Sequence, residues 1–263
     1  MTGNALSLLT MERLPRPVFV RQQEMPARHY FPAHTHNWHQ LLYAVSGVLV
    51  VSVVGERFFI PPEKAIWLPE GCEHSVYSEF GADLKSLYIA SEYDGLPSDK
   101  TVVLRISPLI KALILEAAGF EVAYPLQGYE QSLISLMLQT LSRLPQDEEH
   151  LPWPVDRELF ALCNRLYEHP GDRTMISELV HGLSMSGRTL DRKFRKETGM
   201  SLQAWRGRLR LMKAIELLNT GQSITQIALE LGYSSPSPFI YMFREHTGIS
   251  PAQYRKQQES GQG

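Results

Sequence analysis

An internal repeat in the last third of the chain constrains the fold more than any other feature. Phe194-Arg195 and Thr198-Gly199 recur at an offset of 49 residues as Phe243-Arg244 and Thr247-Gly248. Ahead of each copy, apolar residues at helical spacing match at an offset of 48, namely Ile176, Leu179, Val180 and Leu183 against Ile224, Ile227, Ala228 and Leu231. The one-residue slip falls between these blocks, in a turn, where an insertion costs least. Each copy therefore predicts a short helix, a tight turn and a longer helix.

Signals for helix ends surround both copies. Residues that can cap a helix N-terminus precede the apolar segments, at Thr174, Ser186, Ser201, Ser223, Ser237 and Ser250. Pro238 and Pro251 then take the first helical position. Glycines stand where helices should end, at Gly199, Gly221, Gly232 and Gly248. These signals predict helices over residues 156–169, 175–181, 187–198, 202–219, 224–231, 238–247 and 251–258.

Charge is distributed unevenly along the chain. The formal net charge is −2, but residues from Asp156 onward carry a net +4 and the first 155 residues a net −6. Between Ser186 and Lys213 there are nine basic residues and two acidic ones. Such a stripe attracts phosphate groups, although the same pattern occurs on an ordinary solvated helix face. Two helix-turn-helix units with this charge favour DNA binding over a helical bundle with chance similarity.

These residues resemble the AraC/XylS family of transcription regulators, and the resemblance covers the C-terminal third. In the second copy it is carried by residues 224–232, 233–239, 242–244, 247–248, 250–251 and 254–255. In the first copy it is carried by residues 184–186, 188–190, 192, 194–195 and 198–199. The resemblance implies a sequence-specific regulator whose two units, joined by the long helix 202–219, address successive turns of a DNA duplex.

The longer helix of the first copy has a charged outer face. Leu190 and Phe194 would point inward, which turns outward Arg188, Thr189, Asp191, Arg192, Arg195 and Lys196. The family resemblance places base contacts on Arg188, Asp191 and Arg192. Arginine pairs with guanine, and aspartate accepts a hydrogen bond from cytosine N4. The predicted phosphate contacts are Arg195, Lys196, Arg206 and Arg208.

The longer helix of the second copy departs from the family pattern. Its outward residues are Ser237, Ile240, Tyr241 and Arg244, where relatives usually have more polar or basic side chains. Ile240 cannot hydrogen-bond a base edge, although it can pack on a thymine methyl group. We therefore expect the first copy to supply more of the base specificity and the second copy more of the positioning.

The first half of the chain predicts a different architecture. Residues 16 to about 100 contain short alternating or β-branched runs, at 40–44, 48–54, 57–60, 65–68 and 84–90, with turns between them. Many short strands at this spacing predict a small antiparallel barrel or sandwich. From Ser107 onward the apolar period becomes helical, and the proline-containing stretch 145–154 has the composition of a linker.

Histidines mark the start of this predicted barrel. On an extended strand His34, His36 and Gln40 share one face, and His39 points to the other. The spacing from Gln40 to Gly47 and the Pro-x-Gly-x-x-His run that ends at His74 resemble the two cupin motifs. Metal-binding cupins have three histidines and one glutamate at these four positions. Gln40 stands at the glutamate position, and it is a neutral and poorer ligand.

Two roles for His34, His36 and His74 stay open. Three imidazoles on neighbouring strands can hold Zn, Ni, Fe or Mn, with water or an effector completing the coordination sphere. The alternative is that they only line an effector pocket or pack in the barrel. Trp38 and Trp67 face the same choice between pocket and core, and a core position is the more common outcome for tryptophan in a small barrel.

Together these features predict two domains, an N-terminal all-β cupin-like barrel with accessory helices and a C-terminal all-α domain with two helix-turn-helix units. The predicted parts are an effector-sensing barrel (1–106), accessory and dimerisation helices (107–145), a linker (146–155) and a double helix-turn-helix DNA-binding domain (156–259). Cys72 and Cys163 cannot form a disulfide framework, and we find no signal peptide or membrane-spanning run. We expect a cytoplasmic protein with no membrane partner.

The expected function is allosteric transcription regulation. A small molecule or metal ion binds the barrel, shifts the population of two conformations and changes how a homodimer binds promoter DNA. Activation would require contact with RNA polymerase, for which no motif is evident, whereas repression requires only occlusion. A cupin-type metalloenzyme is the alternative, but fusion to a DNA-binding module makes sensing simpler, so we expect no enzyme activity. A third class, a DNA-architectural protein, would give an effector-independent footprint.

Overall fold

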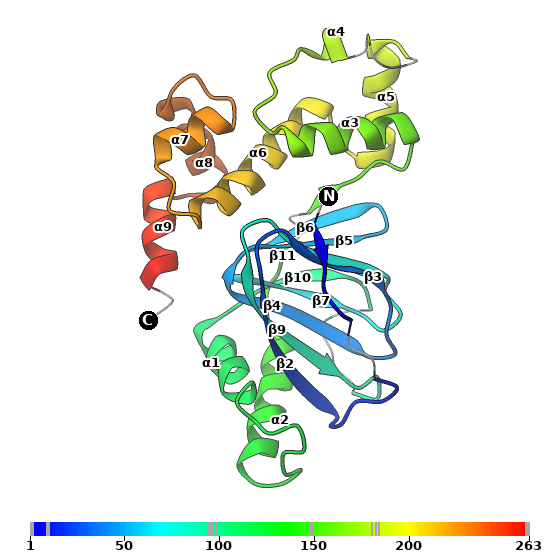
Figure 1. Cartoon of the computed structure of the whole chain (residues 1–263), viewed down its shortest axis with the longest axis vertical. Coiled ribbons are helices and arrows are strands. Elements are labelled where there is room, and N and C mark those ends of the chain that lie inside the picture. Colours follow the sequence, from blue (N-terminus) through cyan, green and yellow to red (C-terminus); the bar gives the residue numbers. More distant parts are fainter. Residues whose placement is uncertain are drawn as a thin grey trace. The chain divides into compact units, whose positions relative to one another are not determined.

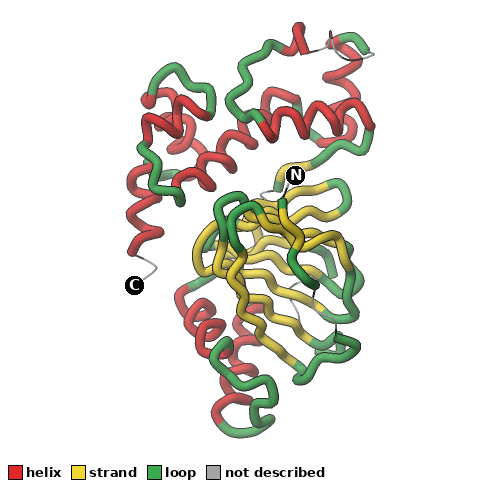
Figure 2. Tube along the Cα trace, in the orientation of Figure 1, coloured by secondary structure: helices red, strands yellow, loops and turns green. Residues whose placement is uncertain are grey.

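The computed structural model describes residues 3–8, 11–93, 97, 99–147, 150–179, 181, 183 and 185–260. Contacts within the chain divide it into two units. The first consists of Met1–Val54 and Phe58–Glu149, and the second of Gly55–Arg57 and His150–Gly263. The first unit contains most of the strands drawn in yellow in Figure 2, and the second is largely helical but includes β12 (Leu151–Pro152). The predicted fold class, with β-sheets and accessory helices first and helix-turn-helix units second, is confirmed.

The strands form two six-stranded sheets (Figure 1). One sheet has the order β1 (Asn4–Ala5), β3 (His29–His34), β8 (His74–Ser78), β5 (Leu49–Val53), β6 (Glu56–Ile60) and β12 (Leu151–Pro152). The other has the order β11 (Gln146–Asp147), β10 (Val102–Arg105), β7 (Lys64–Leu68), β4 (His39–Gly47), β9 (Ala82–Ile89) and β2 (Val18–Met25). Most pairs are antiparallel, as predicted, and β1 pairs with β3 in parallel.

Alternation along β4 separates two apolar cores. Leu42 and Ala44 belong to a buried cluster that includes residues of both sheets, whereas Leu41 and Tyr43 belong to a cluster shared with helices α1 (Pro108–Ala117) and α2 (Tyr129–Leu141). Successive side chains of a strand point to opposite faces, so one sheet is covered on both sides. Figure 1 shows these two helices beside β2 and β9.

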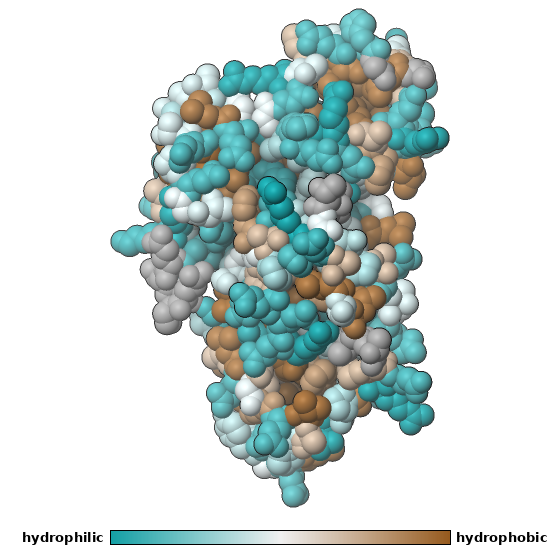
Figure 3. All heavy atoms as spheres, in the orientation of Figure 1, coloured by the Kyte–Doolittle hydropathy of each residue, from teal (hydrophilic) through white to brown (hydrophobic). Residues whose placement is uncertain are grey.

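The accessory helices form where the helical period predicted them. Ser107 caps α1 by accepting a hydrogen bond from the Ile110 backbone N–H. Buried residues on both helices pack against the sheet, whereas other large apolar side chains stay exposed, at Leu109, Leu115, Tyr129 and Leu136. On the face shown in Figure 3, hydrophilic and apolar side chains are interspersed. None of the described helices has both the length and the apolar character that a bilayer-spanning segment needs.

The second unit contains helices α3 (Arg157–Glu168), α4 (Ile176–Leu179), α5 (Gly187–Thr198), α6 (Leu202–Leu218), α7 (Ile224–Glu230), α8 (Pro236–Thr247) and α9 (Pro251–Ser260). Ser186, Ser201 and Ser223 cap α5, α6 and α7 through their side chains. Gly199 and Gly248 end α5 and α8 with φ values of 72° and 78°, a backbone conformation that glycine adopts without strain.

Three predictions about this region need correction. Helix α8 begins at Pro236 with Ser235 as its N-cap, two residues before the predicted Ser237 cap, because the N–H groups of a first turn have no helical partner and Pro238 is tolerated there. The first helix of the first copy is shorter than 175–181, and Val180 lies outside the described residues. The segment predicted as a linker contains the short strands β11 and β12, which pair with β10 and β6.

Candidate functional site

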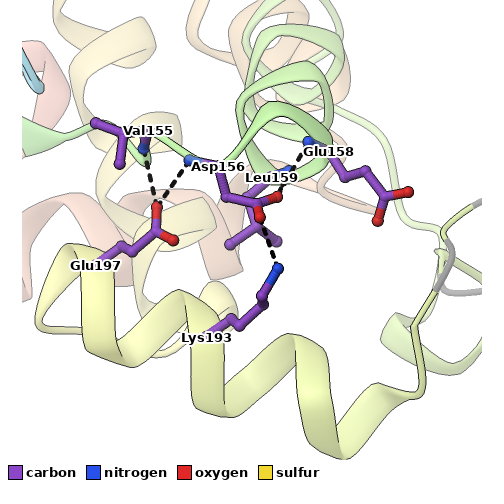
Figure 4. Close-up of polar contacts among 6 residues, drawn as sticks. All are labelled: Val155, Asp156, Glu158, Leu159, Lys193 and Glu197. Carbon is purple, nitrogen blue, oxygen red and sulfur yellow. Dashed lines mark hydrogen bonds and ion pairs between the residues drawn. The ribbon is translucent and has the colours of Figure 1, made fainter.

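The longer helix of the first helix-turn-helix unit, α5, is fixed to the start of α3 by reciprocal polar contacts (Figure 4). Asp156 caps α3 by accepting hydrogen bonds from the backbone of Glu158 and Leu159, and it also accepts one from Lys193 Nζ at 2.6 Å. Glu197 Oε2 accepts from the backbone N–H groups of Val155 and Asp156 at 2.9 and 3.0 Å. These contacts set the orientation of α5 within the second unit.

The outer face of α5 carries the residues predicted to contact DNA. Arg188, Arg192, Arg195 and Lys196 are exposed, and Thr189 and Asp191 are partly exposed. Arg195 donates to Asp191 at 2.9 Å, one helical turn away, so these two side chains form an exposed ion pair. Arg188 and Arg192 thus present guanidinium groups on the same surface as this pair.

Arg206 and Arg208, predicted phosphate contacts on α6, have hydrogen bonds to backbone carbonyl oxygens instead. Arg206 donates to Thr174 at 2.8 Å and also to Asp172, and Arg208 donates to His150 at 3.0 Å. Both side chains are partly buried. Their observed contacts hold neighbouring segments of the second unit in place, and a role at phosphate groups stays a prediction.

Helix α8 of the second unit presents a less charged face. Its predicted DNA contacts Ser237, Ile240, Tyr241 and Arg244 are all exposed, with 37% of Ile240 and 69% of Tyr241 accessible. Phe239 and Phe243 are fully buried beneath them, among residues of α6, α7 and α9. The side chains predicted to contact DNA on α5 and α8 therefore point outward in both helix-turn-helix units.

A backbone contact joins the loop before α4 to the turn between α7 and α8. A Cβ atom added to Gly171 would collide with the carbonyl oxygen of Glu230, and one added to Gly232 would collide with that of Gly171. Arg210 donates to Pro170 and Asp172 at 3.0 Å and strengthens the same loop. This contact connects the two helix-turn-helix units away from α6, and Gly171 and Gly232 are its only trace in the sequence.

A cavity of about 310 Å³ lies in the first unit, and the predicted histidines line it. His34 ends β3, His74 begins β8 directly opposite it, and His36 follows β3. The ring centroids of His34 and His74 lie 4.3 Å apart, and those of His36 and His74 lie 5.2 Å apart. One ligand atom from each histidine lies within 4.8 Å of the others, so the three side chains could hold a metal ion.

The outer ring nitrogens fix how these imidazoles are oriented. Nδ1 of each histidine lies 2.8–2.9 Å from a backbone carbonyl oxygen. The carbonyl belongs to Pro32 for His34, to Trp38 for His36 and to Cys72 for His74. A carbonyl only accepts, so each Nδ1 carries the hydrogen. Burial lowers the pKa of His34 and lowers that of His74 to about 4, which keeps both rings neutral at pH 7. Their Nε2 lone pairs therefore face the cavity, as in metal-binding histidines.

Two further observations fit a metal ion at this cluster. His74 is 1% exposed, and its Nε2 has no hydrogen-bond partner among the described residues. Gln40 Oε1 lies 2.8 Å from His36 Nε2, so the amide oxygen is near enough to join the three imidazoles as a fourth ligand.

His39 and the two tryptophans fall on different faces. The ring of His39 stacks on Trp67 at 5.2 Å, on the helix-covered side of the sheet, as strand alternation predicted. Trp67 is fully buried in that core. Trp38 instead lines the cavity and stacks on His36 with an interplanar angle of 5°. Trp67 is therefore a core residue, whereas Trp38 belongs to the cavity lining.

Ser86, Tyr88 and Arg21 complete the polar part of the cavity lining and were not among the predicted site residues. Gln40 donates to Ser86 at 3.3 Å, and Tyr88 interacts with both Ser86 and Arg21. Burial raises the pKa of Tyr88, partly opposed by these hydrogen bonds. The lining also includes the apolar side chains Phe31, Leu42, Val76 and Leu84, which we call the apolar wall. No run was predicted over β2 (Val18–Met25), so the sequence offered no signal that Arg21 faces the cavity.

Known protein families match both units. The family described as helix-turn-helix domain matches residues 179–257, and the family described as AraC-like ligand binding domain matches residues 16–113. The chain is 31% identical over 223 residues to the HTH-type transcriptional regulator NimR of Escherichia coli (strain K12), with 85% of this chain and 81% of NimR covered. It is 26% identical over 247 residues to the HTH-type transcriptional activator RhaS of Escherichia coli O6:H1, with 86% and 88% covered.

A solved structure of ToxT from Vibrio cholerae aligns with 92% of this chain and 98% of ToxT, at 13% identity and a TM-score of 0.38, which is too distant to transfer residue roles. The curated relatives regulate transcription, and this confirms the expectation that the chain is not an enzyme. Its helix-turn-helix units bind DNA, and its first unit is a ligand-binding domain. The chain belongs to the AraC family of helix-turn-helix transcriptional regulators.

Proposed function

We propose that this protein is a sequence-specific regulator of promoters whose DNA binding responds to a small molecule or metal ion in the cavity of its first unit. The observation that carries this proposal is the buried Nε2 of His74, which faces a closed set of imidazoles without a partner among the described residues. An unsatisfied buried polar group is costly, so a ligand that satisfies it binds with a corresponding gain. A ligand that binds one of two conformations more tightly shifts the population toward that conformation.

Base reading is assigned to the first helix-turn-helix unit. Arg188 and Arg192 are exposed on α5 and match the outward positions of the family pattern, with Asp191 and Thr189 beside them. We assign phosphate contacts first to Arg195 and Lys196, and then to Arg244 on α8. Arg206 and Arg208 come last, because their side chains already donate to backbone carbonyl groups. Ser237, Ile240 and Tyr241 on α8 position the second helix-turn-helix unit in the major groove of DNA.

The metal proposal concerns His34, His36 and His74, with Gln40 as a fourth, weaker ligand. Neutral imidazoles suit Zn, Ni or Fe, and the amide oxygen suits Mn or Fe. A bound ion would supply positive charge and an open coordination position for an effector. The residues of the chain fix the ring orientation through their Nδ1 hydrogen bonds and exclude water with the apolar wall.

The proposal also covers the oligomeric state and the cellular location. A homodimer would use the exposed apolar residues Leu109, Leu115 and Leu136 of the accessory helices, which a partner copy would cover. Two linked DNA-binding units raise avidity on a repeated site. We place the protein in the cytoplasm, where promoter DNA and RNA polymerase are present, and propose 1–106 as the sensing part and 156–259 as the DNA-binding part.

The experiment that tests this proposal combines metal analysis with DNA binding. The full chain, purified without chelator, and the variant His36→Ala/His74→Ala are compared by elemental mass spectrometry and by gel mobility shift on DNA selected from random duplexes. We expect near-stoichiometric metal in the parent, none in the variant, and a change in DNA affinity on metal removal from the parent only. His39→Ala is the matched control, because His39 faces away from the cavity.

The opposite results are equally informative. Absence of metal from the parent, together with failed reconstitution, would leave the histidines as the lining of an organic-effector pocket. DNA affinity that never changes with any occupant of the cavity would contradict regulation through this unit and would indicate the architectural role instead.

A further inference from the structure

The cavity contains hydrogen-bond donors as well as imidazole lone pairs. Trp38 is 6% exposed, and its Nε1 has no hydrogen-bond partner among the described residues. An indole N–H can only donate, so the missing partner must be an acceptor. Arg21 lines the same cavity from the inner face of β2. Its guanidinium also only donates, and it keeps its positive charge at all physiological pH values.

These donors lie close to the histidine cluster. Arg21 hydrogen-bonds Tyr88, whose ring centroid is 5.8 Å from that of Trp38 and 6.1 Å from that of His36. Burial raises the pKa of Tyr88, so the phenol is neutral and does not cancel the charge of Arg21. Glu12, the acidic residue among the described cavity-lining side chains, is exposed, and water screens its charge.

The charge and the shape of the cavity together restrict its ligand. The lining combines a planar cation and an indole N–H with the apolar side chains Phe31, Leu42, Val76 and Leu84. A guanidinium matches the two oxygens of a carboxylate. A sugar would place several hydroxyl groups against the apolar wall, where they would lose hydrogen bonds to water. A phosphate would bring close to two negative charges to a single guanidinium.

We infer that the effector is a small monocarboxylate whose carboxylate is bound by Arg21 and the Trp38 N–H, with an apolar remainder against Phe31, Leu42, Val76 and Leu84. This inference rests on the proposed function, because it names the ligand class of the same cavity. The volume of about 310 Å³ lies at the lower end of the range for small-molecule sites and limits the remainder to a short chain or a single ring. A metal ion on the histidines would add positive charge to the same cavity.

Isothermal titration of the full chain tests the ligand class. The probes are the straight-chain carboxylates from acetate to octanoate and benzoate, each paired with its primary amide, which has the same shape without the charge. We expect at least one carboxylate to bind about tenfold or more tightly than its amide, because a hydrogen bond between charged groups is stronger than a neutral one. The preference should appear in chelator-treated and in Zn²⁺-loaded protein, since Arg21 and Trp38 are present in both.

Two variants separate the role of Arg21 from a general charge effect. Arg21→Met should abolish the preference for carboxylate, whereas Arg105→Met should keep it, because Arg105 is an exposed residue of β10 that pairs with Asp147. If circular dichroism shows that Arg21→Met is unfolded, Arg21→Lys replaces it. Lysine keeps the charge but loses the planar fork, so the preference should fall without vanishing.

The outcomes distinguish this inference from the proposed function. The inference is overturned if no carboxylate in the series binds more tightly than its amide, or if Arg21→Met keeps the preference. A carboxylate that binds through Arg21 but leaves DNA affinity unchanged in a mobility shift would support the ligand class and contradict regulation through the cavity.

Discussion

The two helix-turn-helix units are nearly identical inside. Thr198 donates to the carbonyl oxygens of Phe194 and Met200 at 2.7 and 3.2 Å, and Thr247 donates to those of Phe243 and Ile249 at 2.8 and 3.0 Å. The glycine that follows each threonine ends its helix in the left-handed conformation. The buried aromatic residue, the threonine and the glycine therefore build the same helix end twice.

The outer faces of the two units differ as much as the interiors agree. Helix α5 presents Arg188 and Arg192, whereas α8 presents Ile240 and Tyr241 at the corresponding surface. Only α5 has, among the described residues, the ion pair to Asp156 and the contacts of Glu197 with the start of α3. The comparison teaches that buried positions set the repeated fold, while exposed positions are free to divide the work on DNA.

The largest expected effect concerns the backbone contact of Gly171 with Gly232, which joins the two helix-turn-helix units. Gly232 has a φ of +82°, and a Cβ there would also collide with the backbone of Gly171, so Gly232→Ala should lower the free energy of unfolding by about 3 kcal/mol. Gly199→Ala is the matched control, because Gly199 has a φ of +72° but no atom near its Cβ position, and it should cost only about 1 to 2 kcal/mol. Urea denaturation measures both. Equal losses would show that the backbone contact contributes nothing.

A smaller effect tests whether the two interiors are energetically equivalent. Thr198→Val and Thr247→Val each remove a hydroxyl that bridges the end of a helix to the residue two positions later. Each should lower the free energy of unfolding by about 1 kcal/mol, because one net hydrogen bond is lost and the volume is kept. Thermal denaturation at one scan rate compares them. Losses that differ by more than about twofold would contradict the equivalence. They would mean that the deeper burial of Thr198 outweighs the shared hydrogen bonds.

The smallest effect concerns the contact between Asp156 and Lys193, which anchors α5 of the first helix-turn-helix unit to the start of α3. Asp156→Ala removes an N-cap and an ion pair and should cost about 1 kcal/mol, whereas Asp156→Asn keeps the cap and should cost about 0.5 kcal/mol. The hydrogen bond from Lys193 lowers the pKa of Asp156 below its ordinary value of 3.8. Its contribution is therefore complete at neutral pH and is lost as the pH falls below 3.8 and through the folded value.

Denaturation of the parent and of Asp156→Asn between pH 7 and pH 2 checks this prediction. The difference between the two proteins should disappear toward the acidic end. A difference that stays constant across the range would mean that the carboxylate charge is irrelevant to the anchor.

Local signals in the sequence predicted the helical unit well. Serine caps and C-terminal glycines act within one helical turn, so Ser186, Ser201 and Ser223 could be placed without knowledge of the tertiary fold. The start of α8 was missed because Ser235-Pro236 and Ser237-Pro238 offer the same local signal twice. Residues 146–155 were read as a linker because two-residue strands form only through pairing with distant strands.

The candidate sites were predictable to different degrees. Strand alternation predicted one face of a single extended strand for His34, His36 and Gln40, and all three do line the cavity. The single strand was wrong, because β3 ends at His34 and β4 begins at His39 in the other sheet, so the side chains converge from two sheets. Arg21 was missed because a sequence pattern assigns charged residues of a half-buried strand to solvent, whereas β2 turns Arg21 into a cavity. The hydrogen bonds of Arg206 to the loop before α4 were equally invisible, since carbonyl groups leave no sequence signal.

We expect the first helix-turn-helix unit to read the bases and the second to position the protein on DNA. The most direct test selects binding sites from a random duplex library with the parent, Arg192→Ala and Tyr241→Ala. We expect Arg192→Ala to lose its preference at one base pair, by about 1 to 3 kcal/mol of discrimination, because a bidentate contact to guanine disappears. Tyr241→Ala should keep the selected sequence and bind it uniformly more weakly. Equal relaxation of sequence preference in both variants, or a loss of preference in Tyr241→Ala alone, would contradict it.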